Sequence, residues 1–283
     1  MKISHWIAAL SLVLAFCASD GSAQLASTPV TRPLAMDRLQ KPASDLFALT
    51  PSQVIALHDD GQKLSPVGSF TLPATESPSD LVVGLINGQV SILVSGSNPV
   101  SGGFVTLYTS AGKQLNSWSS AHRACGMDYD GGHTIFFASC DTNEIYQANL
   151  QVGTQTTFVG EVAGAHHLGP LIVDNARGRL LVGEVDNGEV YDMDMKSHHS
   201  RLFAQGLGTP QAFTFSSSQQ QLLVADSSRR KIYRLDLTAT SPPPVEFGVS
   251  PQFQEPDGVA LLAGGRVAVA DDRANAIFVL PAH

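Results

Sequence analysis

Residues 179–195, RLLVGEVDNGEVYDMDM, contain the repeated unit that determines the fold. An apolar stretch, LLVG, is followed by a polar turn and by a second stretch that begins with the aliphatic–aromatic pair Val190-Tyr191. The same pattern occurs at residues 134–150 (TIFFASCDTNEIYQANL), 221–237 (QLLVADSSRRKIYRLDL) and 266–280 (RVAVADDRANAIFVL). Short apolar stretches separated by turn residues are typical of β-hairpins. The sequence therefore predicts a repeated hairpin.

The spacing of this hairpin predicts a β-propeller. Further apolar stretches, such as residues 170–174 and 200–206, flank the hairpin, so each unit holds about four short antiparallel strands. Units of this kind, repeated every 40 to 50 residues, are typical of propeller blades, which stack around an axis to bury their faces. The fold class is predicted to be all-β, a six-bladed β-propeller over residues 41–283. The aliphatic residue of the pair recurs at intervals of 51, 40, 45, 42 and 45 residues, at Val54, Val105, Ile145, Val190, Ile232 and Ile277.

Both ends of this repeat series lack a strand. The last unit ends three residues after its third strand, at His283, which leaves an outer edge unpaired. The first unit has strands near residues 46–49, 54–58 and 67–72 but no clear first strand. Residues 24–40 are therefore predicted to form a tail that closes the ring, by pairing with the sixth blade or by completing the first.

The N-terminal residues 1–23 are predicted to be a signal peptide. Lys2 gives a positive start, residues 6–16 form an apolar run too short to span a bilayer, and the small residues 21–23 permit cleavage before Gln24. The alternative is a lipoprotein anchored through Cys17. The protein is expected to be secreted or periplasmic.

Composition excludes several classes of partner. Asp and Glu number 25 against 17 Lys and Arg, which gives a formal net charge of -8, and the largest basic group is residues 229–231. Nucleic acid and anionic membranes require a basic face, so neither is expected as a partner. No other apolar run reaches membrane length. A monomer that binds a small molecule or a protein at its axial face is predicted.

Two cysteines, Cys125 and Cys140, remain after removal of the leader. They are equidistant from the centre of a predicted hairpin near residues 132–133, so they are expected to face each other across neighbouring strands. An oxidising compartment favours a structural disulfide between them. A redox-active pair, without the CxxC spacing, and two free buried thiols are the alternatives.

Residues 209–280 resemble a known group of propellers. TPQAFTFSSSQQQLLVADSSRRKIYRLDL (209–237) is similar to the Pro-Asn-Gly segment of SMP-30/gluconolactonase-like and strictosidine-synthase-like propellers. EPDGVALLAGGRVAVADDRANAIFVL (255–280) is similar to the Pro-Asp-Gly blade that follows it in those families, and more loosely to NHL repeats. The resemblance implies a divalent metal, often calcium, on the propeller axis, held by a Glu, the Asn of a Pro-Asn-Gly motif and the Asp of Pro-Asp-Gly. Asp257 matches that Asp, Gln211 replaces the Asn, and no matching Glu motif is found.

The loops that lead into the innermost strands are expected to meet at one end of the axis. His122, His167 and Glu255 occupy the same offset in their units, so they are predicted, with His166 as a substitute for His167, to bind a divalent metal such as zinc or calcium. The alternative is that these loop histidines are solvated or bonded to backbone. The further assignments are Asp257 as an additional metal ligand, Asp257 and Arg123 as catalytic residues, and Asp80, His166 and Gln211 as ligand-binding residues.

Two functional classes follow from these observations. The first is an exported, metal-dependent hydrolase, lactonase- or esterase-like, in which the metal activates water, Asp257 acts as base and Arg123 orients an anionic substrate. The second is a non-catalytic propeller that binds a ligand or a protein. Whether the chain is an enzyme stays open from the sequence.

Overall fold

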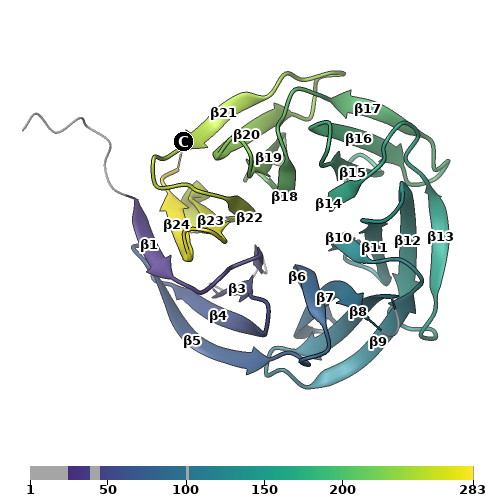
Figure 1. Cartoon of the computed structure of the whole chain (residues 1–283), viewed down its shortest axis with the longest axis horizontal. Helices are drawn as coiled ribbons and strands as arrows, with labels where there is room; N and C mark the ends of the chain where they lie inside the picture. The colour runs from purple at the N-terminus through teal and green to yellow at the C-terminus, as the bar shows by residue number, and fades with distance from the viewer. Residues whose placement is uncertain (1–24, 39–44, 100–101, 283) are drawn as a thin grey trace, which may run out of the picture.

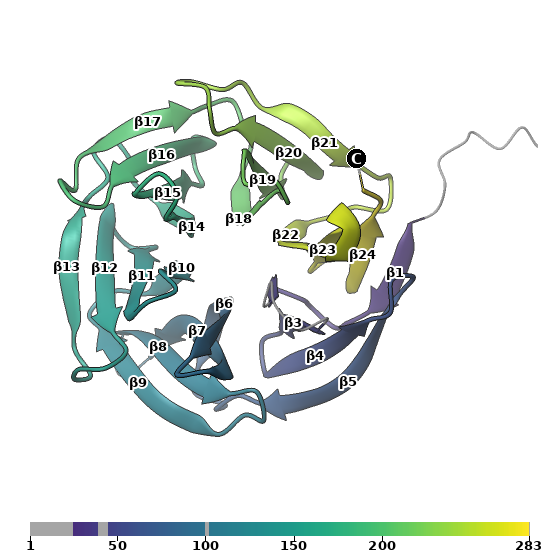
Figure 2. The ribbon, with the colours of Figure 1, turned by 180° about the vertical axis from the view of Figure 1, so that it is seen from behind.

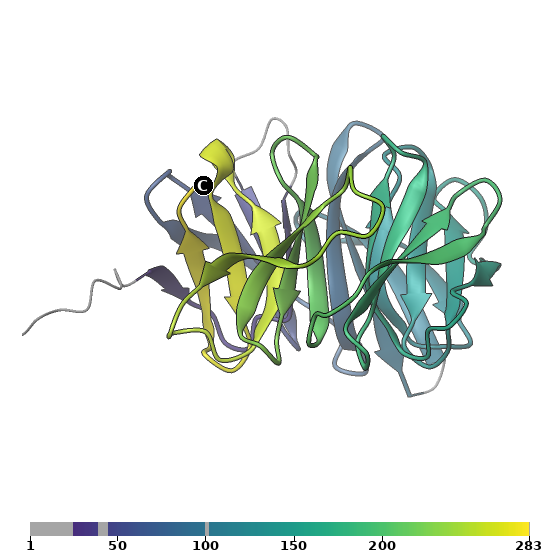
Figure 3. The same ribbon diagram turned by 90° about the horizontal axis from the view of Figure 1, so that it is seen from above.

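Six four-stranded sheets form a closed ring in the computed structural model, which describes residues 25–38, 45–99 and 102–282. The predicted six-bladed β-propeller is confirmed (Figure 1). The strands of each blade stand side by side from the axis to the rim, and the blades form a short cylinder in side view (Figure 3). The only helical element among the described residues is the short 3-10 helix η1 (Ala263–Gly265).

Blades one to three run from the axis outward in chain order. The strands are β2 (Ala35–Arg38), β3 (Asp45–Leu49), β4 (Gln53–Asp59) and β5 (Leu64–Thr71) in blade one; β6 (Ser77–Ile86), β7 (Gln89–Asn98), β8 (Gly102–Thr109) and β9 (Gln114–Ser120) in blade two; and β10 (Ala124–Tyr129), β11 (Thr134–Ser139), β12 (Glu144–Asn149) and β13 (Thr156–Glu161) in blade three.

Blades four and five follow the same order, and blade six differs because its outermost strand comes from the N-terminal end of the chain. The strands are β14 (Leu168–Asp174), β15 (Arg179–Glu184), β16 (Glu189–Asp194) and β17 (Ser200–Ala204) in blade four; β18 (Pro210–Phe215), β19 (Gln221–Asp226), β20 (Lys231–Asp236) and β21 (Val245–Val249) in blade five; and β22 (Pro256–Leu261), β23 (Val267–Asp271), β24 (Ala276–Leu280) and β1 (Ala26–Pro29) in blade six.

The hydrophobic core lies between the blades. The aliphatic residue that marks each repeat is at most 1% exposed in all six units, because it faces the neighbouring sheet. Six apolar clusters result, and each joins two adjacent blades. One of them, for example, packs Phe136 and Ile145 of blade three against Leu168 and Val182 of blade four.

Turn geometry also repeats from blade to blade. The turn between β15 and β16 ends at Gly188, whose φ is 67°, and a Cβ there would lie 2.1 Å from the carbonyl oxygen of Leu207. Glycine is therefore required at this position. Arg230 and Asn275 adopt the same left-handed conformation at the equivalent places of blades five and six.

Residues 26–38 supply a strand to both ends of the ring. β1 pairs with β24 and completes blade six, whereas β2 is the innermost strand of blade one. β1 lies at the outer edge of the ring in both axial views (Figure 1 and Figure 2). Two side-chain contacts add to this junction: the Thr28 hydroxyl donates to the carbonyl oxygen of Leu64 at 2.8 Å, and Arg266 forms an ion pair with buried Asp59 at 2.7 Å.

Candidate functional site: the central channel

A channel with a volume of about 700 Å³ follows the propeller axis. The innermost strands β2, β6, β10, β14 and β18 line it, from His167 and Gln211 near the start of these strands to Gly131 and Asn175 beyond their ends. Small-molecule sites in proteins commonly have this size. The channel is therefore the candidate functional site.

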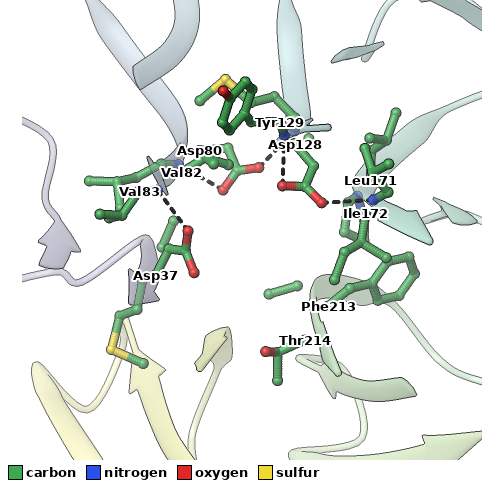
Figure 4. A pocket seen from close by; sticks show the side chains of 18 of the residues that line it. Asp37, Asp80, Val82, Val83, Asp128, Tyr129, Leu171, Ile172, Phe213 and Thr214 are labelled. Atoms are coloured by element: carbon green, nitrogen blue, oxygen red, sulfur yellow. Dashed lines mark hydrogen bonds between the residues drawn. The ribbon is translucent and has the colours of Figure 1, made fainter. Parts of the chain in front are cut away.

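Three aspartates on adjacent blades line one side of this channel: Asp37 on β2, Asp80 on β6 and Asp128 on β10 (Figure 4). An innermost strand has one free edge, whose backbone N–H groups have no strand partner and require acceptors. The Oδ1 atom of each aspartate accepts the N–H of the next residue in its own strand at 2.7 Å. Each carboxylate therefore satisfies part of the free edge of its own blade.

The same carboxylates also connect neighbouring blades. The Oδ2 atom of each aspartate accepts a backbone N–H from the innermost strand of the following blade, so blades one to four are joined in series along the channel. The donors are Val83 to Asp37 at 2.7 Å, Met127 to Asp80 at 2.8 Å and Val173 to Asp128 at 2.7 Å.

The environment of these three groups shifts their pKa upward, into the neutral range. They are partly accessible from the channel but lie deep in the molecule, and this burial raises the pKa of each to about 7. The backbone hydrogen bonds oppose the shift, because they stabilise the ionised form, and a neighbouring channel aspartate adds to it by like-charge repulsion. A carboxyl with a pKa near neutrality can both donate and accept a proton.

The opposite side of the channel is mainly apolar. In blade three, Asp128 pairs with Phe136 of the second strand. The residues equivalent to Phe136 pair with Ile172 in blade four and with Thr214 in blade five. Ile172 and Thr214 therefore occupy the position that Asp128 has in blade three. Phe213 adds an aromatic ring to this side, and Thr214 turns its hydroxyl toward the channel (Figure 4). The channel therefore has a carboxylate side on blades one to three and an apolar side on blades four and five.

Several residues singled out in the sequence lie in this channel. Asp80, His167 and Gln211 belong to its lining, as does Cys125. The predicted disulfide between Cys125 and Cys140 is confirmed, with the two Cα atoms 5.6 Å apart. It connects the channel wall at β10 to the turn after β11. The ligand-binding roles predicted for Asp80 and Gln211 stay predictions.

Three of the predicted site residues contact carboxylates of their own blades. His122 lies 3.7 Å from Glu144, Arg123 forms an ion pair with Asp141 at 2.7 Å, and His167 lies 3.4 Å from Asp186. His166 and Glu255 are exposed. Asp257 is largely buried, and burial, with Glu255 and Asp272 nearby, raises its pKa to about 8.

The structure does not confirm the predicted metal site. Within the described part of the chain, no group of three or more His, Cys, Asp or Glu side chains is arranged to hold a metal ion. The metal-ligand roles of His122, His167, Glu255 and Asp257 stay predictions. The catalytic roles predicted for Asp257 and Arg123 stay predictions.

Sequence reasoning missed Asp37 and Asp128. A weak signal was present, because the segments Ala-Met-Asp at residues 35–37 and Gly-Met-Asp at residues 126–128 place an aspartate at the same position of two innermost strands. An aspartate within an apolar strand requires a buried partner or a polar cavity. Blade one had no recognised first strand, and so the two positions could not be compared.

Comparison with known proteins agrees with this architecture. Residues 100–280 match the family model described as the SMP-30/Gluconolactonase/LRE-like region. No curated protein matches the sequence significantly.

Two solved structures are similar in fold. One, from the crystal structure of a nidogen/laminin complex, has 18% identity and a TM-score of 0.67, with 82% of this chain and 87% of that chain covered. The other, a structural genomics protein of unknown function from Bacteroides thetaiotaomicron, has 12% identity and a TM-score of 0.68, with 90% and 70% covered. Identities this low show the fold alone.

Proposed function

Because the chain belongs to the SMP-30/gluconolactonase/LRE-like family, we propose that it binds a small molecule in the central channel. The observation that carries the proposal is the channel of about 700 Å³ with three carboxylates on one side and an apolar surface on the other. Sites of this kind combine apolar area, which supplies affinity, with a few polar groups, which fix orientation. A protein ligand at the axial face is the alternative partner.

A channel-filling variant tests the proposal. Thr214→Trp places an indole in the channel, and Val152→Trp, at an outer loop residue that is 70% exposed, is the matched control. A library of small metabolites is screened by thermal shift against the three proteins. We expect ligands that stabilise the wild type and the control but not Thr214→Trp. The proposal would be contradicted if every ligand found stabilised all three proteins equally, or if no ligand stabilised the wild type.

Hydrolysis of an ester or lactone is a second candidate function. The specific observation in its favour is that Asp80 and Asp128 have pKa values raised to about 7 by burial, which suits general acid–base catalysis near neutral pH. A carboxylate in this position would accept a proton from the attacking water. Chromogenic esters and lactones test the activity, and it should fall about 100-fold or more in Asp128→Asn but not in Asp236→Asn, a variant of an exposed aspartate in blade five.

We also propose that the protein works outside the cytoplasm. The Cys125–Cys140 disulfide supports an oxidising compartment. The predicted signal peptide, residues 1–23, and the lipoprotein alternative at Cys17 lie outside the described residues. No helix among the described residues is long and apolar enough to cross a bilayer. Release of the mature chain into the periplasm or medium, measured by cell fractionation, tests this proposal.

A further inference from the structure

We infer that the ligand of the central channel is an amphiphilic organic cation, an ammonium group on a small apolar or aromatic body. The inference rests on the proposed function, since it names the chemical class that the channel would bind. It follows from the division of the channel into two sides. The carboxylate side would bind the ammonium group, and the apolar side would contact the apolar body.

The charges of the lining favour a cation. Of the four aspartates in the described lining, Asp174 already forms ion pairs with Arg177 and Arg179, both within 3.2 Å. The carboxylates of Asp37, Asp80 and Asp128 accept hydrogen bonds from backbone N–H groups. Arg38 is the one arginine of this lining and there is no lysine, while His167 is turned toward Asp186. An anion would meet an excess of like charge.

The carboxylates keep acceptor capacity for such a ligand. A carboxylate offers about four lone-pair sites on two oxygens. Each channel aspartate uses one site of each oxygen for a backbone N–H, so about two sites per aspartate are left. A charge-assisted N–H···O bond is roughly twice as strong as a neutral one. An ammonium group needs only one or two such carboxylates, unlike a metal ion, for which these residues are not arranged.

The facing surface matches an apolar body. Ile172, Phe213 and Phe215 are only partly buried by the protein, and all three line the channel. An aromatic or aliphatic group placed against them would remove their remaining area from water. The carboxylates would hold the other end of the same molecule. Ligands with both features should therefore bind better than ligands with either one.

Four probes of similar chemistry separate these contributions. Phenethylamine carries both features, phenethyl alcohol lacks the charge, hydrocinnamate reverses it, and ethylamine lacks the ring. Dissociation constants are measured by ligand-observed NMR or calorimetry at neutral pH and low salt. We expect phenethylamine to bind at least about tenfold more tightly than each of the other three, with a preference that weakens as salt is added.

Variants assign the preference to the channel. Asp80→Asn and Asp37→Asn should each weaken phenethylamine binding about fivefold or more and leave phenethyl alcohol unchanged, whereas Asp236→Asn, at an exposed residue outside the lining, should change neither. Circular dichroism shows that each variant is folded. The four-probe series on the wild type remains decisive if an Asn variant does not fold.

Two kinds of result would overturn the inference. Equal binding of the amine and the alcohol, or preference for the anion, with binding lost in Thr214→Trp, would reject the cationic class but leave the channel as a binding site. No binding by any of the four probes would also reject the class, while binding of other library members that Thr214→Trp abolishes would still support the proposed function. If no probe and no library member binds in the channel, both the cationic class and the proposed function are rejected.

Discussion

At the scale of single residues, the channel aspartates have two roles that oppose each other. As hydrogen-bond acceptors, Asp37, Asp80 and Asp128 join the innermost strands of blades one to four. As buried charges, they destabilise the folded state when ionised. The structure keeps them because unpaired backbone N–H groups on a free strand edge would also cost stability.

This opposition predicts how stability depends on pH. Burial raises the pKa of Asp128 to about 7, above its value of about 3.9 in an unfolded chain. Between these two pH values the folded state therefore binds more protons at Asp128 than the unfolded state does. The corresponding stability is fully present below about pH 4 and is lost as the pH rises through about 7. We expect the melting temperature of the wild type to fall between about pH 5 and about pH 8.5, and Asp128→Asn to flatten this profile by roughly 2–4 °C.

The exposed aspartate Asp236 is the matched control. Hydrogen bonds from the side chain and backbone of Thr238 lower its pKa, so it stays ionised throughout that pH range. Asp236→Asn should therefore leave the slope of the profile unchanged. Superimposable profiles of the wild type and Asp128→Asn would show that Asp128 does not titrate in this range.

The disulfide gives a second prediction at this scale. Cys125 and Cys140 close a loop of 15 residues, for which loop-closure entropy corresponds to about 3 kcal/mol of stability. A reductant should lower the melting temperature of the wild type, and the double variant Cys125→Ala/Cys140→Ala should melt at the reduced temperature with or without it. Thiol titration verifies reduction. An unchanged melting temperature of fully reduced wild type would refute the stabilising role.

At the scale of elements, a buried aspartate at the end of the second strand holds the loop that leads into the innermost strand. Asp226 ends β19, has no exposed surface, and accepts the N–H groups of Gly208, Thr209 and Arg229 at 2.6 to 3.1 Å. Asp271 binds the equivalent loop of blade six. These carboxylates determine the path of the chain into β18 and β22.

Removal of this carboxylate should be costly. Asp226→Ala leaves three backbone N–H groups without their charged acceptor, and we expect a loss of about 3 kcal/mol or more in the free energy of unfolding by denaturant. Asp236→Ala is the control, because its carboxylate accepts the N–H of Thr238 on an exposed turn, where water can replace it, so its loss should be much smaller. Equal losses in both variants would contradict the argument.

The elements also show what the sequence could and could not predict. The strand pairs around Ile145, Val190, Ile232 and Ile277 were recognisable, because alternating burial in a repeated hairpin leaves a periodic pattern. β2 was not recognisable, since it has only four residues and two of them, Asp37 and Arg38, are polar. β2 pairs with β3 because blade one has no other innermost strand. That requirement follows from the whole ring and cannot be read from the four residues of β2.

The site was predictable only in part, because a repeat pattern fixes the position of the backbone but not the direction of a side chain. Sequence offsets placed the backbone of His122, His167 and Glu255 at equivalent positions of their blades, but offset does not determine where a side chain points. His122 lies beside Glu144 and His167 beside Asp186, each a carboxylate of the same blade. Asp80, which the sequence offsets assigned to the loop before an innermost strand, lies within β6 and lines the channel.

At the scale of the whole molecule, stability depends on closing the ring. Each apolar cluster joins two blades, so an open ring would expose the facing surfaces of blades six and one. β1 links these blades: it pairs with β24 of blade six, while Thr28 bonds to Leu64 of blade one. Val30, which follows β1, is 5% exposed and packs in the cluster between the two blades.

Deletion of residues 25–30 tests this role of β1. The change removes one strand of blade six and its bond to blade one but keeps β2, and we expect the melting temperature to fall by at least about 5 °C. Deletion of residues 24–40 removes β2 as well and should be more severe. Arg32→Ala is the control, because Arg32 pairs with Asp272 through a side chain that is 59% exposed, and exposed ion pairs contribute little to stability.

A peptide of residues 24–34 adds a direct test of ring closure by this strand. If β1 stabilises the ring by binding the edge of β24, the peptide should raise the melting temperature of the 25–30 deletion. Above its dissociation constant the rise should follow the logarithm of the peptide concentration, because a ligand that binds only the folded state stabilises it by mass action. A scrambled peptide of the same composition should have no effect. An unchanged melting temperature of the deletion itself would mean that the interface between blades six and one is stable without the strand.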